Sequence, residues 1–518
     1  MSFTRIHDLV FQHLDARADA PAIKDCNGRV YSWAAYAALI DEAETLLRSR
    51  GAAPGERVLA IAENCLALPV LMMACSRIGA WCVPVNARMS EAEIAKIAAH
   101  ASPVITLYTS HVSREAARHA GSADQVSTGF GDLQVIGGEP DPEPAENGAD
   151  GTAILLYTTG TTGDPKGVML THANLIFAAR ASANLRSLGP EDHVYGALPL
   201  THVFGVASML MASAYVGAMV ELATRFDPAA LLEALRNGAT VMPAVPQMHA
   251  LLMAKARSEG QSKLNSPTLR YVSSGAAPLD PAWKRAAEDF YDLPLQNGYG
   301  MTESTAGVSG TRNAIGDPDT SVGPALPGIE ISLDLSLGED PEVGEVLTRG
   351  PHVMKGYFRN PEATAAAISA DGWLRTGDLG RIDAGGRLHI SGRAKELIIR
   401  SGFNVYPPEV EAALNDHPAV VQSAVIGRST NGDEEVLAFV QPRAPGAVQE
   451  DELQAFVSER LAGYKRPSRI LLVDALPAAA TGKILKHRLL GHFADRLAAL
   501  GPDGPDHQAS PMPGTEHA

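Results

Sequence analysis

The strongest chemical signal in this sequence is a short stretch rich in glycine and threonine that ends near a lysine. It reads Tyr157-Thr-Thr-Gly-Thr-Thr-Gly-Asp-Pro-Lys166-Gly. Its glycines free the backbone to wrap an anion, its hydroxyls can donate hydrogen bonds, and its lysine adds positive charge. A Walker A loop needs a different spacing and a following helix. Because the β-rich run Gly167–Thr171 follows, we predict a strand-loop-strand element that holds a triphosphate; a hairpin tip without a ligand is the alternative.

Four further short motifs follow this stretch in order. They are Tyr299-Gly-Met-Thr302-Glu303, Gly372-Trp-Leu-Arg-Thr-Gly377-Asp378, Gly392-Arg393-Ala-Lys395-Glu and Thr481-Gly482-Lys483. Any one of them could arise by chance, whereas the ordered set is specific. With the first stretch, they resemble the signature motifs of the adenylate-forming superfamily, which includes acyl-CoA synthetases, adenylation domains of peptide synthetases and luciferases. The resemblance extends from about residue 5 to about residue 495.

The resemblance implies a two-step ligase reaction that uses ATP, Mg²⁺ and coenzyme A. An acyl-CoA synthetase first converts a carboxylic acid and MgATP to an acyl-adenylate and pyrophosphate. It then transfers the acyl group to CoA and releases AMP. A carboxylate is a poor electrophile, and attached AMP is a good leaving group. Since the first step brings anions together, its catalysis should depend on positioning and charge neutralisation.

The same resemblance assigns residues to the phosphates and the metal. It places the loop from Thr158 to Lys166 around the β- and γ-phosphates, and Thr302 at the α-phosphate. It assigns Mg²⁺ to Glu303 and Thr158, whose oxygen atoms suit a hard cation. Taken alone, Glu303 is also compatible with an acid that stabilises a helix N-terminus.

The adenosine part of the nucleotide is assigned in the same way. Tyr299 is expected against adenine, Asp378 at the ribose hydroxyls, and Arg393 near ribose and phosphate. Taken alone, these three are also compatible with a core tyrosine, a turn aspartate and a surface arginine. The residues assigned to ATP and CoA together are Thr158, Thr159, Gly160, Thr161, Thr162, Gly163, Lys166, Gly275, Ala276, Ala277, Tyr299, Gly300, Thr302, Asp378, Arg393, Gly402 and Lys465.

A rotation of the C-terminal domain between the two steps is also implied. Lys483 resembles the catalytic lysine that bridges the acid carboxylate and the α-phosphate, and a solvated lysine before a helix is the alternative. Lys395 occupies the hinge position. Gly402 corresponds to the wall of the tunnel for the pantetheine arm, and Lys465 to a contact for the nucleotide end of CoA.

The acid is the least specified substrate. The resemblance assigns seven residues to its pocket, and His202 acts there as a catalytic gate near the carboxylate. None of the seven is an arginine or a lysine that could pair with a second carboxylate. We therefore expect an apolar monocarboxylic acid, either a fatty acid or an aryl acid, and expect dicarboxylates to be disfavoured. The seven residues are His202, Val203, Phe204, Gly298, Gly300, Thr305 and Ala306.

The elements that must position these residues alternate between helical patterns and short β-rich runs such as Arg57–Ala62 and Ala153–Tyr157. This alternation predicts an α/β fold with largely parallel sheets. A chain of 518 residues predicts two or more domains. We expect a large N-terminal adenylation domain over residues 1–392, with layered α/β subdomains and a small β-barrel-like part. A small mobile α+β domain over residues 393–500 and a disordered tail over 501–518 follow.

Composition excludes several other classes of protein. A net charge of -16 argues against a nucleic-acid partner, which is held by clustered lysine and arginine. The four cysteines form no Cys-x-x-Cys pair, which fits neither a zinc site nor a disulfide framework. The N-terminus lacks the apolar core of a signal peptide, so a cytoplasmic location is expected. The oligomeric state is left open.

One segment, residues 196–220, is long and uncharged enough to suggest a membrane span. The segment contains Pro199, Gly205 and Gly217, and the sequence contains no second segment of this kind. We therefore expect a buried helix followed by a buried strand.

Three alternative functions share the same motifs. The chain could load the acyl group onto a carrier protein, act as a luciferase-like oxygenase, or bind nucleotide without catalysis. The absence of an attached carrier domain favours CoA as the acceptor. Intact Lys483, Glu303 and Asp378 argue against a non-catalytic relative.

Overall fold

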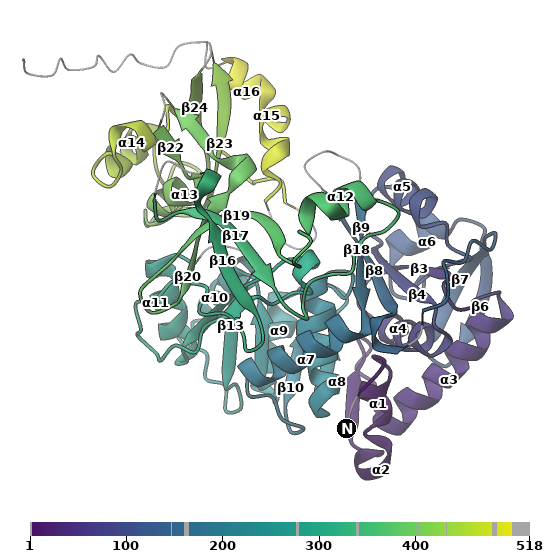
Figure 1. Ribbon diagram of the computed structural model, residues 1–518. Helices are drawn as coiled ribbons and strands as arrows, with labels where there is room; N and C mark the ends of the chain where they lie inside the picture. The colour runs from purple at the N-terminus through teal and green to yellow at the C-terminus, as the bar shows by residue number, and fades with distance from the viewer. Residues whose placement is uncertain are drawn as a thin grey trace, which may run out of the picture. The chain divides into compact units, whose positions relative to one another are not determined.

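A computed structural model divides the chain into two compact units, residues 1–394 and 395–518. It describes residues 3–146, 148–159, 165–275, 279–337, 341–400, 403–430, 433–478 and 484–499. The predicted tail, 501–518, lies outside these ranges. The first unit contains three sheets with helices packed on them, and the second contains a smaller sheet and a hairpin (Figure 1). This mixed α/β fold, with a large N-terminal and a small C-terminal part, confirms the predicted fold class.

One large sheet of the first unit carries the glycine- and threonine-rich stretch. Its eight strands lie in the order β18-β9-β8-β4-β3-β5-β7-β6. Four of them, β3, β4, β5 and β8, pair in parallel. Every residue of β3 is buried, because a parallel strand is covered on both faces. The strands are β3 Arg57–Ala62, β4 Trp81–Asn86, β5 Ile105–Tyr108, β6 Asp124–Thr128, β7 Gly131–Gly137, β8 Thr152–Thr159, β9 Pro165–Thr171 and β18 Gly356–Tyr357.

The other large sheet carries the Tyr299 motif at the end of β14. Its eight strands lie in the order β15-β14-β13-β12-β10-β11-β1-β2. Strands β10 to β14 and β1 pair in parallel, so the carboxyl ends of β13 and β14 lie side by side. The strands are β1 Pro21–Lys24, β2 Val30–Ser32, β10 His193–Gly196, β11 Met219–Leu222, β12 Val241–Ala244, β13 Tyr271–Gly275, β14 Leu295–Tyr299 and β15 Ser309–Gly310.

The third sheet of the first unit is antiparallel and carries Asp378 and Arg393. Its four strands lie in the order β16-β17-β19-β20. This is the small β part that the sequence predicts. The strands are β16 Glu330–Asp334, β17 Gly344–Arg349, β19 Leu374–Ile382 and β20 Leu388–Arg393.

Three helices of the first unit, α9, α11 and α12, begin at a capping residue followed by proline. Asp227, Asp280 and Asn360 each precede a proline in the first turn and accept hydrogen bonds from the backbone amides that the helix leaves unpaired. One core of buried side chains joins both large sheets through these helices. The helices are α1 Asp8–Phe11, α2 Leu14–Arg17, α3 Trp33–Ser49, α4 Ala67–Ile78, α5 Glu91–Ala101, α6 Arg114–Ala120, α7 His172–Leu185, α8 Ala212–Val216, α9 Pro228–Arg236, α10 Pro246–Ser258, α11 Pro281–Tyr291 and α12 Pro361–Ala367. Shorter helical turns are η1 Gly148–Asp150, η3 Thr302–Ser304 and η4 Leu335–Leu337.

The uncharged segment 196–220 belongs to the core. It forms a π-helix, η2 Phe204–Met211, that continues into α8 and then into β11. The buried helix and strand predicted for this segment are therefore confirmed. Across the described ranges, no helix is both long and apolar enough to cross a bilayer.

The second unit is a compact α+β fold with its own core. Strands β23, β24 and β25 form one sheet, and β21 and β22 form a hairpin. Val410, Val425 and Ala438 pack in a core that α13 and α14 close. The elements are η5 Ala394–Glu396, β21 Ile398–Arg400, β22 Phe403–Val405, α13 Pro407–Asn415, β23 Val420–Thr430, β24 Asp433–Pro442, α14 Glu450–Ser458, η6 Gly463–Lys465, β25 Arg469–Leu472, η7 Lys486–Arg488, α15 Leu489–His492 and α16 Ala494–Ala499.

Candidate active site

The glycine- and threonine-rich stretch forms the tip of an antiparallel hairpin. Strand β8 ends at Thr159, β9 begins at Pro165, and Thr158 pairs with Lys166 across them. This confirms the predicted strand-loop-strand element. Both ends of the loop are thereby fixed on a buried sheet. The loop residues Gly160, Thr161, Thr162 and Gly163 lie outside the described residues.

A tyrosine that sequence reasoning did not single out connects Lys166 with Glu303. Tyr357 lies on β18, which pairs with β9. The Nζ atom of Lys166 is 4.9 Å from the centroid of the Tyr357 ring, and the Tyr357 hydroxyl donates to Oε1 of Glu303 over 3.0 Å. Burial, reinforced by the Glu303 charge, raises the pKa of Tyr357, so the phenol keeps its proton and remains a donor. Tyr357 reaches Lys166 and Glu303 because β18 pairs with β9, and this pairing cannot be recognised from the sequence motifs.

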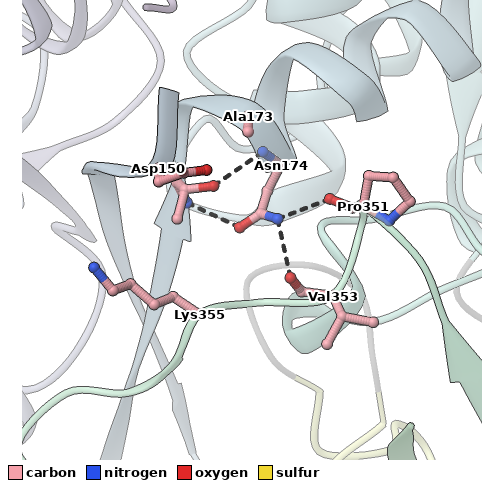
Figure 2. A pocket seen from close by; sticks show the side chains of 7 residues that line it. Asp150, Ala173, Asn174, Pro351, Val353 and Lys355 are labelled. Atoms are coloured by element: carbon pink, nitrogen blue, oxygen red, sulfur yellow. Dashed lines mark hydrogen bonds between the residues drawn. The ribbon is translucent and has the colours of Figure 1, made fainter. Parts of the chain in front are cut away.

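The segment that carries Tyr357 is fixed by Asn174 on α7. Figure 2 shows the Asn174 amide between the carbonyls of Pro351 and Val353, to which its Nδ2 atom donates over 2.8 and 2.9 Å. The backbone amide of Met354 then donates to the carbonyl of Glu303 over 2.9 Å. These bonds set the position of Glu303 relative to β9. The pocket in Figure 2 lies beside this anchor, and none of the site residues predicted from the sequence lines it.

Tyr299, Asp378 and Arg393 form a second cluster. The Tyr299 hydroxyl donates to Oδ2 of Asp378 over 2.5 Å, and Nε of Arg393 lies 3.0 Å from Oδ1. Asp378 is paired with Arg393 across β19 and β20 and is only 4% exposed. Burial, together with the adjacent Asp378 carboxylate, raises the pKa of Tyr299, which therefore stays protonated. A carboxylate offers two acceptor oxygens on one rigid group, which is the chemistry that a diol requires.

The carboxyl ends of β13 and β14 bring Gly275 opposite Gly298. A Cβ atom at Gly300 would overlap the carbonyl oxygen of Ala306, so this position admits only glycine. Thr305 and Ala306 both have positive φ, 48° and 80°, an unfavourable backbone conformation for residues with a Cβ atom. This strained turn follows Thr302, which is 8% exposed in η3. Ala276 and Ala277 lie outside the described residues.

Of the residues predicted for the acyl pocket, Phe204 lies at the end of β13 and its backbone amide bonds to His202, whereas Val203 and Thr305 are buried in the core. The ring of Phe204 lies against Gly275, where a Cβ atom would be 3.2 Å from its Cε1 atom. His202 precedes this ring and accepts at Nδ1 from the Phe204 amide over 3.3 Å. Val203 and Thr305 are buried, at 2% and 0% exposure, and the Thr305 hydroxyl donates to the carbonyl of His352. Phe204 is therefore the large side chain of the set that borders the β13 terminus.

In the second unit, Lys465 lies 2.6 Å from Oε1 of Glu409. Burial lowers the pKa of Lys465, but the Glu409 carboxylate outweighs this effect and raises it, so the ammonium group stays charged. Lys395 lies in η5, directly after the division between the units. Gly402 and Lys483 lie outside the described residues.

Comparison with known proteins decides what these clusters belong to. The AMP-binding enzyme family matches residues 10–358, and the AMP-binding enzyme C-terminal domain matches residues 409–483. The chain belongs to the AMP-binding enzyme family. It is 33% identical to 4-coumarate–CoA ligase 5 of Oryza sativa subsp. japonica, over 95% of both chains, and 35% identical to a feruloyl-CoA synthase of Amycolatopsis sp, over 86% and 91%. These relatives place it in the CoA-ligase branch of the adenylate-forming superfamily.

A solved structure agrees with this placement. The o-succinylbenzoate coenzyme A synthetase of Bacillus subtilis, in complex with ATP and magnesium ion, superposes with a TM-score of 0.79 at 28% identity, covering 93% of this chain and 98% of that one. The protein is an ATP-dependent, AMP-forming CoA ligase that uses ATP, Mg²⁺ and coenzyme A. A non-catalytic relative is thereby set aside.

Proposed function

We propose that this ligase activates an aryl monocarboxylic acid of the arylpropenoate type and transfers it to CoA. The observation that carries the proposal is the contact of the Phe204 ring with Gly275, a residue that the family resemblance assigns to the nucleotide site. An aromatic wall favours a flat aryl group through stacked or edge contacts. The relatives named for 4-coumarate and ferulate act on acids of this type. A fatty acid of similar length is the second candidate.

The two clusters supply the groups that the first half-reaction needs. We propose that Lys166 and the hairpin loop hold the β- and γ-phosphates, while Asp378 and Arg393 hold the ribose. Mg²⁺, when bound, would neutralise charge on the phosphates. The carboxylate of Glu303, with the Thr158 hydroxyl, fits that hard cation because both provide oxygen ligands. His202 would close the acid side near the reacting carboxylate.

A panel of acids tests the substrate class. CoA-dependent AMP release is measured with cinnamate, 4-hydroxycinnamate, benzoate and octanoate, and kcat/KM is compared. The arylpropenoates are expected to give the highest values. A higher kcat/KM with octanoate than with every aryl acid would exclude the proposal. Pyrophosphate exchange that proceeds without CoA, followed by transfer only to a carrier protein, would instead favour the carrier-loading alternative.

Replacement of Tyr357 by phenylalanine tests the arrangement at Glu303. The change removes the hydroxyl that donates to Glu303 and keeps the ring beside Lys166. Loss of a partner that orients a metal ligand costs about 10- to 100-fold in metal affinity, so the Mg²⁺ concentration for half-maximal pyrophosphate exchange is expected to rise by about tenfold or more. Tyr36→Phe is the control, because the Tyr36 hydroxyl is buried without a hydrogen-bond partner among the described residues. An unchanged Mg²⁺ dependence would remove Tyr357 from this role.

A further inference from the structure

Arg186 is a buried arginine that the first unit brings against the proposed acyl site. It follows the C-terminus of α7 and is 6% exposed. Its guanidinium carbon lies 5.9 Å from the centroid of the Phe204 ring. Arg186 precedes the pocket residue His202 in the sequence and is not one of the pocket residues assigned by resemblance, which include no arginine or lysine. Tertiary packing therefore adds a cation that the motif comparison did not supply.

The charge of Arg186 has no acidic partner among the described residues. One terminal N–H donates to the carbonyl of Ser208 in η2, and the Tyr271 hydroxyl is a further hydrogen-bond partner of the guanidinium group. The buried Nε atom has no hydrogen-bond partner within the part of the chain that the structure describes. The Tyr271 hydroxyl favours the charged form, but burial has the larger effect and lowers the pKa of Arg186. A guanidinium group nevertheless remains charged at neutral pH. A buried charge without a counter-charge is costly, and an anion or a strong oxygen acceptor would reduce that cost.

A purely structural role explains only part of this arrangement. Arg186 could serve to satisfy the Ser208 carbonyl, because a π-helix disturbs the regular hydrogen bonding of its turn. A neutral donor would suffice for that purpose. A guanidinium group has five N–H donors, and its bonds to a neutral carbonyl and a neutral phenol supply no counter-charge that would offset its desolvation.

One face of β13 extends from Gly275, which the family resemblance assigns to the nucleotide site, to Tyr271, which lies beside Arg186. Side chains at alternate positions of a strand share one face, so Tyr271, Ser273 and Gly275 lie in a row. Phe204 lies at the Gly275 end, and Tyr271 lies beside Arg186 at the other end. Ser273 lies between them on the same face of the strand and is only 7% exposed. The four strand steps from Tyr271 to Gly275 cover roughly 13 Å.

We infer that Arg186 recognises an oxygen acceptor at the end of the acid that is distal to the reacting carboxylate. The inference rests on the proposed function for the direction in which the acid lies. A guanidinium fork binds a carboxylate or phenolic oxygen through charge-assisted hydrogen bonds. The acid class is thus narrowed to aryl acids with a distal oxygen substituent. A second carboxylate shares this chemistry, so Arg186 also revises the expectation that dicarboxylates are disfavoured.

Two matched sets of acids test the inference. The first set is cinnamate, 4-hydroxycinnamate and 4-carboxycinnamate, and the second is octanoate and octanedioate. For the wild type, an acid with a distal oxygen should have the higher kcat/KM. Arg186→Met should lower kcat/KM for these acids by about 10- to 100-fold, through the KM of the acid, and leave cinnamate and octanoate nearly unchanged. The KM of ATP should not change.

Three controls separate recognition from folding. Arg180→Met removes an exposed arginine from the same helix and should change neither preference nor rate. Arg186→Lys keeps the charge without the fork and should keep part of the preference. The Tm of Arg186→Met should equal or exceed that of the wild type, because an uncompensated buried charge is replaced by an apolar side chain.

The possible outcomes are distinct. A selective loss for the oxygen-bearing acids supports the role of Arg186, and the acid set in which it occurs distinguishes a phenolic oxygen from a second carboxylate. An equal loss for every acid, or no loss, overturns it. If only octanoate and octanedioate are activated, the proposal of an aryl acid fails. The comparison of these two acids in the wild type and in Arg186→Met then still tests the role of Arg186.

Discussion

Replacement of Lys483 by alanine is expected to slow acyl-adenylate formation by about 10²- to 10³-fold, because one preorganised cation would be lost where negative charge develops on the carboxylate and the α-phosphate. Thioester formation from supplied acyl-adenylate and CoA should remain close to the wild-type rate, since the resemblance assigns Lys483 to the first half-reaction alone. Pyrophosphate exchange measures the first step, and conversion of synthetic acyl-adenylate measures the second.

Lys255→Ala is a suitable control for that experiment. Lys255 is a surface lysine on α10 that pairs with Glu259, and its loss should affect neither step. An equal loss of both half-reactions in Lys483→Ala would contradict the assignment and point to a folding defect.

The second large effect is expected for Lys395→Pro. Lys395 directly follows the division between the two compact units, where we propose that the domains 1–392 and 393–500 rotate between the half-reactions. Proline fixes φ near -65° and removes an N–H donor, so it should hold one arrangement, the adenylating one. Thioester formation should then fall on the order of 10²-fold, since a misplacement of about 1 Å already has an effect of that size. Adenylate formation should persist.

Lys395→Ala provides the matched comparison, because it removes the charge and leaves the backbone free to rotate. Its effect on both steps should be small. If Lys395→Pro performs both half-reactions at wild-type rates, the hinge must lie elsewhere in the chain.

The sequence predicted the fold class because its signals are local. The apolar β-rich runs of β3 and β8 alternate with helical patterns, and this alternation can be recognised without reference to distant residues. The strand-loop-strand reading of the phosphate stretch was correct for the same reason, since a β-rich run after Lys166 excludes a helix there.

The distant partners of the site residues were not predictable in this way. Tyr357 reaches Lys166 and Glu303 only because β18 pairs with β9, and this pairing leaves no mark in the spacing of either segment. Asn174 forms the capping box of α7 with Thr171 and also holds the carbonyls that precede Tyr357.

The sequence by itself determined the reaction class, because its five ordered motifs are each contiguous and together resemble those of the adenylate-forming superfamily. Tertiary structure alone decided how the site residues meet. The register of β19 and β20 places Arg393 at Asp378, and the end of α7 places Arg186 beside Phe204. The physical reason is that a binding site depends on side chains from separate elements, whose proximity is set by long-range packing rather than by local pattern.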